Sequence, residues 1–149
     1  MKRMKRITRS LTLVFVGATI LWLGLSPGAQ GGGKFRARLS PVPVEASTVA
    51  GITGSGSVTA VLTGTKLAIT GTFEGLRTPA TVAHLHRAPK GVRGPAMFDL
   101  TVSKATSGTI SGTLTLTPAR VEDLEQGRFY VQIHSEKAPE GNLWGWLLQ

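Results

Sequence analysis

Short segments in which apolar and polar residues alternate recur along the chain from residue 35 onward. In the first of them, residues 35–39, three apolar side chains alternate with two arginines. Similar runs, rich in Val, Ile and Thr, cover residues 54–62, 66–73, 81–86, 96–102, 107–116, 128–134 and 143–148. A period of two marks a strand with one buried face, and Gly, Pro and Thr between such runs mark turns. We therefore predict an all-β protein, a Greek-key antiparallel sandwich or barrel of about eight strands.

One segment departs from this pattern and predicts a single short helix at residues 118–125. Thr117 is a typical N-cap residue, and Pro118 suits the first helical position. Gly127 follows the segment and favours its termination. Val121 and Leu124 are expected to face inward, so that the helix crosses one end of the β structure.

The first 31 residues have the physical pattern of a secretory signal peptide. Five basic residues and no acidic ones lie within residues 1–9, and an uninterrupted apolar run follows over 11–25. Ser26-Pro27-Gly28 then ends the run before small residues. The alternative is a retained membrane anchor, although a spanning helix needs roughly 20 apolar residues and this run is shorter. We predict cleavage, export to the periplasm or the exterior, and no stable membrane span afterwards.

Charge and cysteine content restrict the remaining chain. The whole sequence has 17 Lys and Arg against 8 Asp and Glu. Because five basic residues lie in the predicted leader, the excess falls to +4, and the remaining charges are scattered. This pattern argues against a nucleic-acid partner. The absence of cysteine excludes disulfides and thiolate chemistry, leaving imidazole, carboxylate and thioether as metal ligands.

Several motifs together resemble the CHRD domain, named for repeats in chordin and widespread in bacterial exported proteins. The His-Leu-His run with its Gly-Pro turn (83–95), Phe-Asp-Leu (98–100), Tyr-Val-Gln-Ile-His (130–134) and the segment 139–145 carry the likeness. The resemblance runs from about residue 35 to residue 148, so we predict one domain over residues 34–149, and it implies extracellular protein binding. Two departures from the usual motifs are Gln132, where Asn is typical, and 142–144, where Glu-Ile-Arg is typical.

A fainter similarity connects the chain with the layout of Cu/Zn superoxide dismutase, a Greek-key β-barrel. His84, His86 and His134 match three of the four copper-binding positions of that enzyme, and Ala96 falls on the fourth, which bridges the metals there. The zinc ligands, the disulfide cysteines and the substrate-guiding arginine have no evident counterparts. The resemblance thus implies either this barrel or an immunoglobulin-like sandwich, and argues against dismutase activity.

Strand parity predicts where the three histidines point. Residues two apart on a strand share a face, so His84 and His86 lie side by side, and His134 lies opposite the apolar residues of its own strand. If the two strands adjoin, the imidazoles converge on one outer patch. Three imidazoles suit copper or zinc, with copper favoured by the stability order of divalent metals. Met97 is a possible fourth ligand, and Asp99 is either a ligand or a partner that orients a histidine.

Two other interpretations of this patch stay open. The imidazoles could form a purely structural hydrogen-bonded cluster, with rings pointing at backbone carbonyls. The patch could also be a protein or glycan surface, to which Trp144 would contribute as part of an aromatic strip. We expect a binding protein and not an enzyme. Its partner would be a copper ion or, in a metal-free chordin-type module, another extracellular or periplasmic protein.

Overall fold

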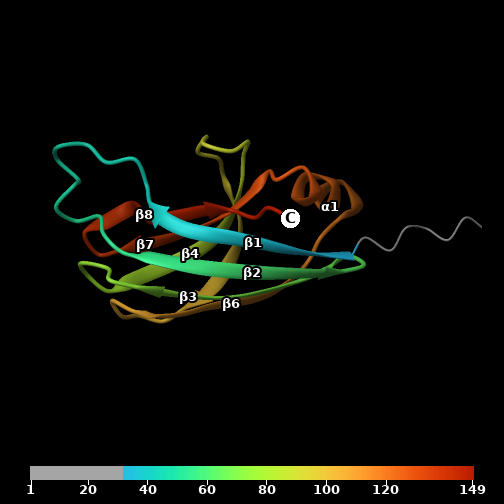
Figure 1. The fold of residues 1–149 in the computed structure, drawn as a ribbon, viewed down its shortest axis with the longest axis horizontal. Coiled ribbons are helices and arrows are strands. Elements are labelled where there is room, and N and C mark those ends of the chain that lie inside the picture. Colours follow the sequence, from blue (N-terminus) through green and yellow to red (C-terminus); the bar gives the residue numbers. More distant parts are fainter. Residues whose placement is uncertain (1–31) are drawn as a thin grey trace, which may run out of the picture.

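Residues 32–149 form an antiparallel barrel of eight strands with one helix at its end (Figure 1). A computed structural model describes residues 32–149; the predicted leader lies outside them. The strands are β1 (Gly32–Pro41), β2 (Ser55–Thr63), β3 (Lys66–Glu74), β4 (Ala80–Arg87), β5 (Ala96–Val102), β6 (Gly108–Thr115), β7 (Phe129–Ser135) and β8 (Ala138–Trp146), and the helix is α1 (Pro118–Glu125). The predicted fold class is confirmed.

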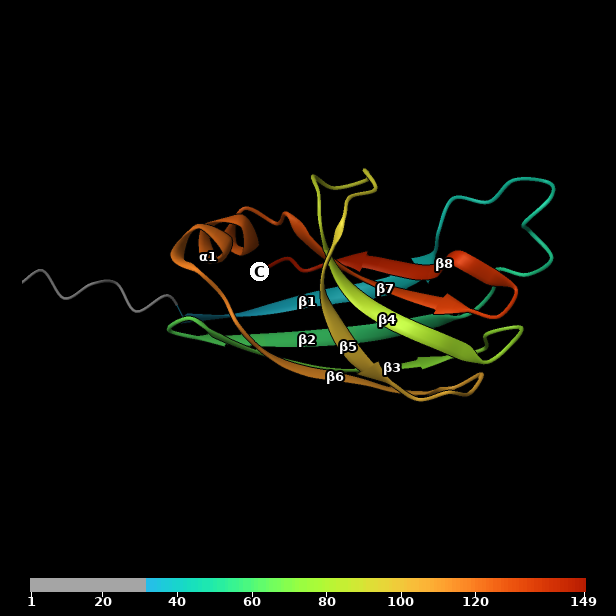
Figure 2. The same cartoon turned by 180° about the vertical axis from the view of Figure 1, so that it is seen from behind.

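The strand order around the barrel is β1-β2-β3-β6-β5-β4-β7-β8, with β8 returning to β1. Hairpins join β1 to β2 to β3, β4 to β5 to β6, and β7 to β8, whereas β3 lies beside β6 and β4 beside β7. These two pairings, β3 with β6 and β4 with β7, join strands that are not consecutive in the chain and form overlapping Greek keys. Their consequence for the site is direct, because they bring β4 and β7 together although about 45 residues separate them in the chain (Figure 2).

The inward face of every strand contributes to one apolar core. On β1 the buried residues are Phe35, Ala37 and Leu39, which is the predicted alternation. On β4 and β7 the core residues are Ala83, Leu85, Phe129, Val131 and Ile133, all at most 1% exposed. A closed barrel leaves no unpaired sheet edge, so this single core can support the fold without disulfides.

Helix α1 begins as the sequence predicts. The Thr117 side chain accepts a hydrogen bond from the Arg120 backbone N–H, and Pro118 occupies the first turn. Leu124 is fully buried and Val121 packs against the same core. The helix is also tied to β4, because Arg87 donates two hydrogen bonds to the Asp123 carboxylate, at 2.6 and 2.9 Å. Arg128 contacts the same carboxylate.

This ion pair makes stability depend on pH. The hydrogen bonds from Arg87 lower the pKa of Asp123 below its usual value of 3.8, so the pair stabilises the fold above that value and loses its effect as acid protonates the carboxylate. Asp123→Asn should therefore lower the free energy of unfolding at pH 7, and the deficit should shrink as the pH falls below 4. Urea denaturation at several pH values checks this. Glu122→Gln, an exposed neighbour, is the matched control, and a deficit independent of pH would contradict the prediction.

Two features of β7 and β8 differ from the sequence-based prediction. Strand β8 begins at Ala138 and not at residue 143, because Ser135 pairs with Ala138 across a two-residue turn. The outer face of these strands also carries its own apolar cluster, in which Tyr130 and Trp146 are buried and Trp144 packs against them. Among residues 32–149, no helix has the length and apolarity needed to cross a membrane.

Candidate metal centre

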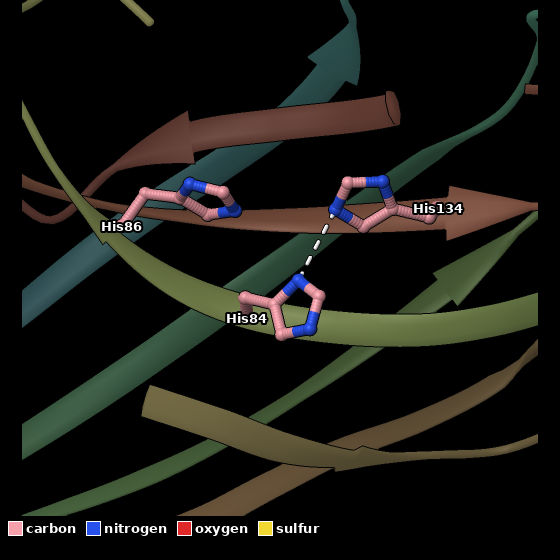
Figure 3. Close-up of side chains that lie close together, drawn as sticks. All are labelled: His84, His86 and His134. Atoms are coloured by element: carbon pink, nitrogen blue, oxygen red, sulfur yellow. Dashed lines mark hydrogen bonds between the residues drawn. The ribbon is translucent and has the colours of Figure 1, made fainter. Parts of the chain in front are cut away.

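The three histidines of the chain lie side by side on the outer face of β4 and β7, as strand parity predicts. In the antiparallel register His84 pairs with Gln132, and Val82 pairs with His134. The side chains of His84, His86 and His134 therefore emerge from the same face, opposite the core (Figure 3). His86 is only 8% exposed, and the other two rings are half-buried, so the outer patch is more enclosed than the sequence indicates.

One ring nitrogen from each histidine contributes to a compact triad. These three nitrogens all lie within 4.8 Å of one another. They are therefore within about 3 Å of a common point, against imidazole–metal bonds of about 2 Å. The His84 Nδ1 to His134 Nε2 distance is 3.3 Å, which suits two nitrogens bound to one ion. Small ring rotations would bring all three to bonding distance.

The orientation of His86 leaves one nitrogen available. Its Nδ1 lies 2.9 Å from the Gly94 carbonyl oxygen, which can only accept, so Nδ1 must donate its proton. In the neutral ring Nε2 then carries a lone pair. Within the described chain this buried nitrogen has no hydrogen-bond partner. An unsatisfied buried acceptor costs free energy, so it calls for an explanation.

Tyr130 holds His86 and the Gly94 loop together. Its ring stacks on the imidazole, with centroids 4.8 Å apart and an interplanar angle of 15°. Its hydroxyl accepts from the Gly94 N–H at 3.0 Å and donates to the Gly94 carbonyl at 3.3 Å. A side chain at Gly94 would collide with the Arg87 carbonyl, so the loop can approach His86 this closely only with glycine.

His134 is oriented in the same way from β8. Its Nδ1 donates to the Pro139 carbonyl oxygen at 2.7 Å, which leaves the Nε2 lone pair facing His84. Burial lowers the pKa of both His86 and His134, and this outweighs the opposing effect of each carbonyl bond. Both rings are thus kept neutral with a free Nε2, the form that binds metals.

His84 lies between two acceptors. On one side its Nδ1 faces His134 Nε2, and on the other its Nε2 is 3.5 Å from the Asp99 carboxylate. A neutral imidazole has a single N–H, so it can satisfy only one of these contacts. If Nε2–H faces Asp99, two lone pairs face each other across 3.3 Å, and a cation between them would relieve that repulsion.

The remaining predicted site residues lie at different places. Asp99 pairs with His84 across β4 and β5, but its side chain is 97% exposed, which suits an orienting contact better than ligation. Met97 lies at the bulge beside Ala96 and packs against the main core. Ala96 pairs with His86, so the fourth position of the resemblance offers no donor. Trp144 is half-buried on the outer face, and its role as part of a binding strip stays a prediction.

Several residues near the triad were not identified from the sequence. Tyr130, Gly94 and Pro139 orient the rings through the contacts above. Arg93 is a nearby cation that donates to the Glu140 carbonyl at 2.7 Å and lies 5.9 Å from the Trp144 ring centre. Two of these contacts are made by backbone carbonyls, which no side-chain pattern reports.

Comparison with known proteins gives one result. A family model described as CHRD domain matches residues 35–147. Neither a search of curated proteins nor a search of solved structures gives a match.

Proposed function

The chain belongs to the CHRD domain family, and from that premise we propose that it is an exported, non-catalytic protein that binds one copper ion through His84, His86 and His134. CHRD domains are typically extracellular. Export agrees with the leader pattern of residues 1–31.

The observation that carries the proposal is the unsatisfied Nε2 of His86. It is buried and faces two other imidazoles, while the second nitrogen of its ring is held by a carbonyl. In metal sites, a histidine ligand usually donates its other N–H to a carbonyl or carboxylate, which fixes the tautomer. His86 and His134 both have that partner, and the Asp99 carboxylate lies 3.5 Å from His84 Nε2.

The donor set supports copper as the metal. Three neutral imidazoles without a thiolate bind Cu(II) more tightly than Zn(II) in the stability order of divalent ions. A bound copper ion would supply one-electron redox chemistry. The residues of the chain would hold and orient the ion: backbone carbonyls fix the rings of His86 and His134, and Tyr130 stacks on His86 while its hydroxyl binds Gly94 in the β4–β5 loop.

Two other functions compete with this one. A purely structural role accounts for the two carbonyl contacts but leaves His86 Nε2 unexplained. A metal-free interaction module would depend on the half-exposed Trp144, and then substitutions there, not at the histidines, would govern partner retention in a pull-down. A dismutase-like enzyme is the least supported function because Ala96 replaces the fourth donor. This function would be ruled out if copper-loaded protein, with a chelator present, removed superoxide no faster than free copper does.

A titration with Cu(II), Cu(I) and Zn(II) tests the proposal. In the protein without residues 1–31, Trp144 and Trp146 are the remaining tryptophans, so fluorescence reports from the aromatic cluster that contacts His86 through Tyr130. We expect one ion per chain, sub-micromolar affinity for copper, and weaker binding of zinc. The proposal would be contradicted if copper bound only at micromolar affinity or weaker and this binding were unchanged in the protein with both His84→Ala and His134→Ala.

A further inference from the structure

A shallow groove with aromatic and cationic walls lies on the barrel surface beside the metal centre. It encloses about 350 Å³ where β1 and β8 meet under the β4–β5 loop. Its walls include Arg36, Arg38, Lys90, Trp144 and Trp146. None of these side chains belongs to the histidine triad, and the proposed copper site does not account for them.

The register of β1 and β8 explains why these residues gather. Ser40 pairs with Trp144, and Arg36 forms a bridge with Leu148, so the outward residues of the two strands stand opposite each other. On β1 these outward side chains are two arginines and a serine, all exposed. On β8 they are the two tryptophans, whose rings are 4.7 Å apart at an angle of 66°.

The charges of the groove are uncompensated. No Asp or Glu is among its lining residues, and in residues 32–149 no ion pair involves Arg36, Arg38 or Lys90. The side chain of Arg93 adds a fourth positive charge near Trp144. Three exposed cations without an acid repel one another, so an anion in the groove would be stabilised by all of them.

We propose that this groove binds a sugar unit that carries an anionic group, either a carboxylate or a sulfate. The half-buried Trp144 offers apolar ring surface for the C–H face of a pyranose, and the buried Trp146 packs against it. Arg36 and Arg38 offer planar forks that pair with a carboxylate or sulfate through two hydrogen bonds. The Ser40 hydroxyl is an additional donor or acceptor for a sugar hydroxyl. Neither an acidic peptide nor a neutral glycan uses both halves of this arrangement.

Four probes separate the possible ligands, with tryptophan fluorescence of the protein without residues 1–31 as the readout. They are trigalacturonic acid, a heparin-derived tetrasaccharide, maltotriose and a poly-glutamate peptide of similar charge. We expect at least one of the two anionic sugars to bind at least tenfold more tightly than both other probes, and the tighter one identifies the anionic group. Equal affinity for poly-glutamate would show charge attraction alone and overturn the proposal, as would the absence of binding by both sugars.

Sugar affinities of single variants, measured by calorimetry, test whether the sugar binds in this groove. Arg38→Ala and Lys90→Ala change exposed side chains and should each weaken the favoured sugar by about fivefold or more. Arg77→Ala removes the same charge from an exposed position outside the groove and should leave affinity unchanged. Trp144→Phe should also weaken binding while keeping an aromatic ring in the cluster. Equal losses for Arg38→Ala and Arg77→Ala would refute the site. The His84→Ala, His134→Ala double variant should still bind the sugar, which keeps this test independent of copper.

Discussion

His86→Ala should lower the affinity for Cu(II) by at least about 100-fold, since even residues that merely orient a ligand contribute 10- to 100-fold. The reason is the position of this ring: its Nε2 is the buried donor without a partner, and Gly94 and Tyr130 hold it towards the other two imidazoles. Competition titration against a chelator of known copper affinity measures the change. The copper-induced rise in melting temperature should disappear in parallel.

Val82→Ala is the matched control for this substitution. Val82 is exposed on the same strand, pairs with His134, and has no metal-binding atom. Copper affinity should stay within about twofold of the parent protein, because the three donors and their carbonyl partners are untouched. If His86→Ala also stays within that range, copper does not bind through the triad.

Leu85→Ala should lower the free energy of unfolding by about 2–5 kcal/mol, the usual cost of a cavity in a packed core. Leu85 lies between His84 and His86 in sequence, yet its side chain points to the opposite face and is fully buried in the main core. Chemical denaturation of the metal-free protein, with the slope of the transition compared between variants, measures the loss.

The control for the core is again Val82→Ala, whose exposed side chain should contribute less than about 0.5 kcal/mol. A loss below about 1 kcal/mol for Leu85→Ala would mean that neighbouring side chains fill the cavity, contrary to a closely packed barrel. Together, His86→Ala and Leu85→Ala separate the two faces of one strand, one for metal binding and the other for stability.

Much of the fold follows from local pattern. The alternation at residues 35–39 predicts a strand in β1 and which of its side chains point inward and outward. The predicted strand at residues 96–102 has the same bounds as β5. Helix α1 follows from Thr117 and Pro118 because capping is a local interaction. The start of β8 was missed: Pro139 and the charged residues around it have the composition of a turn, and only pairing with β7 makes them a strand.

The site follows from the sequence only in part. Parity gives the shared face of His84 and His86 and the outward direction of His134, but only the pairing of β4 with β7 shows that the three rings share one patch. The burial of these rings and their fixed tautomers depend on Gly94 and Pro139, whose carbonyls carry no sequence signal. The stacking of Tyr130 on His86 also has no sequence signal, because a tyrosine on a strand is as typical of core packing as of contact with a ligand-binding residue.

The sequence by itself determined the all-β class, the helix at residues 118–125 and the outward direction of each histidine on its own strand, because each depends on periodicity or capping within a few residues. The pairing of β4 with β7, which brings the three imidazoles together, was decided by the tertiary structure. The tertiary structure alone decided which nitrogen of each ring is free and where β1 meets β8. Those features arise from the Greek-key crossovers and from barrel closure, which bring together backbone atoms and side chains far apart in the chain. Contacts at such separation depend on register and loop path, and no local pattern encodes either.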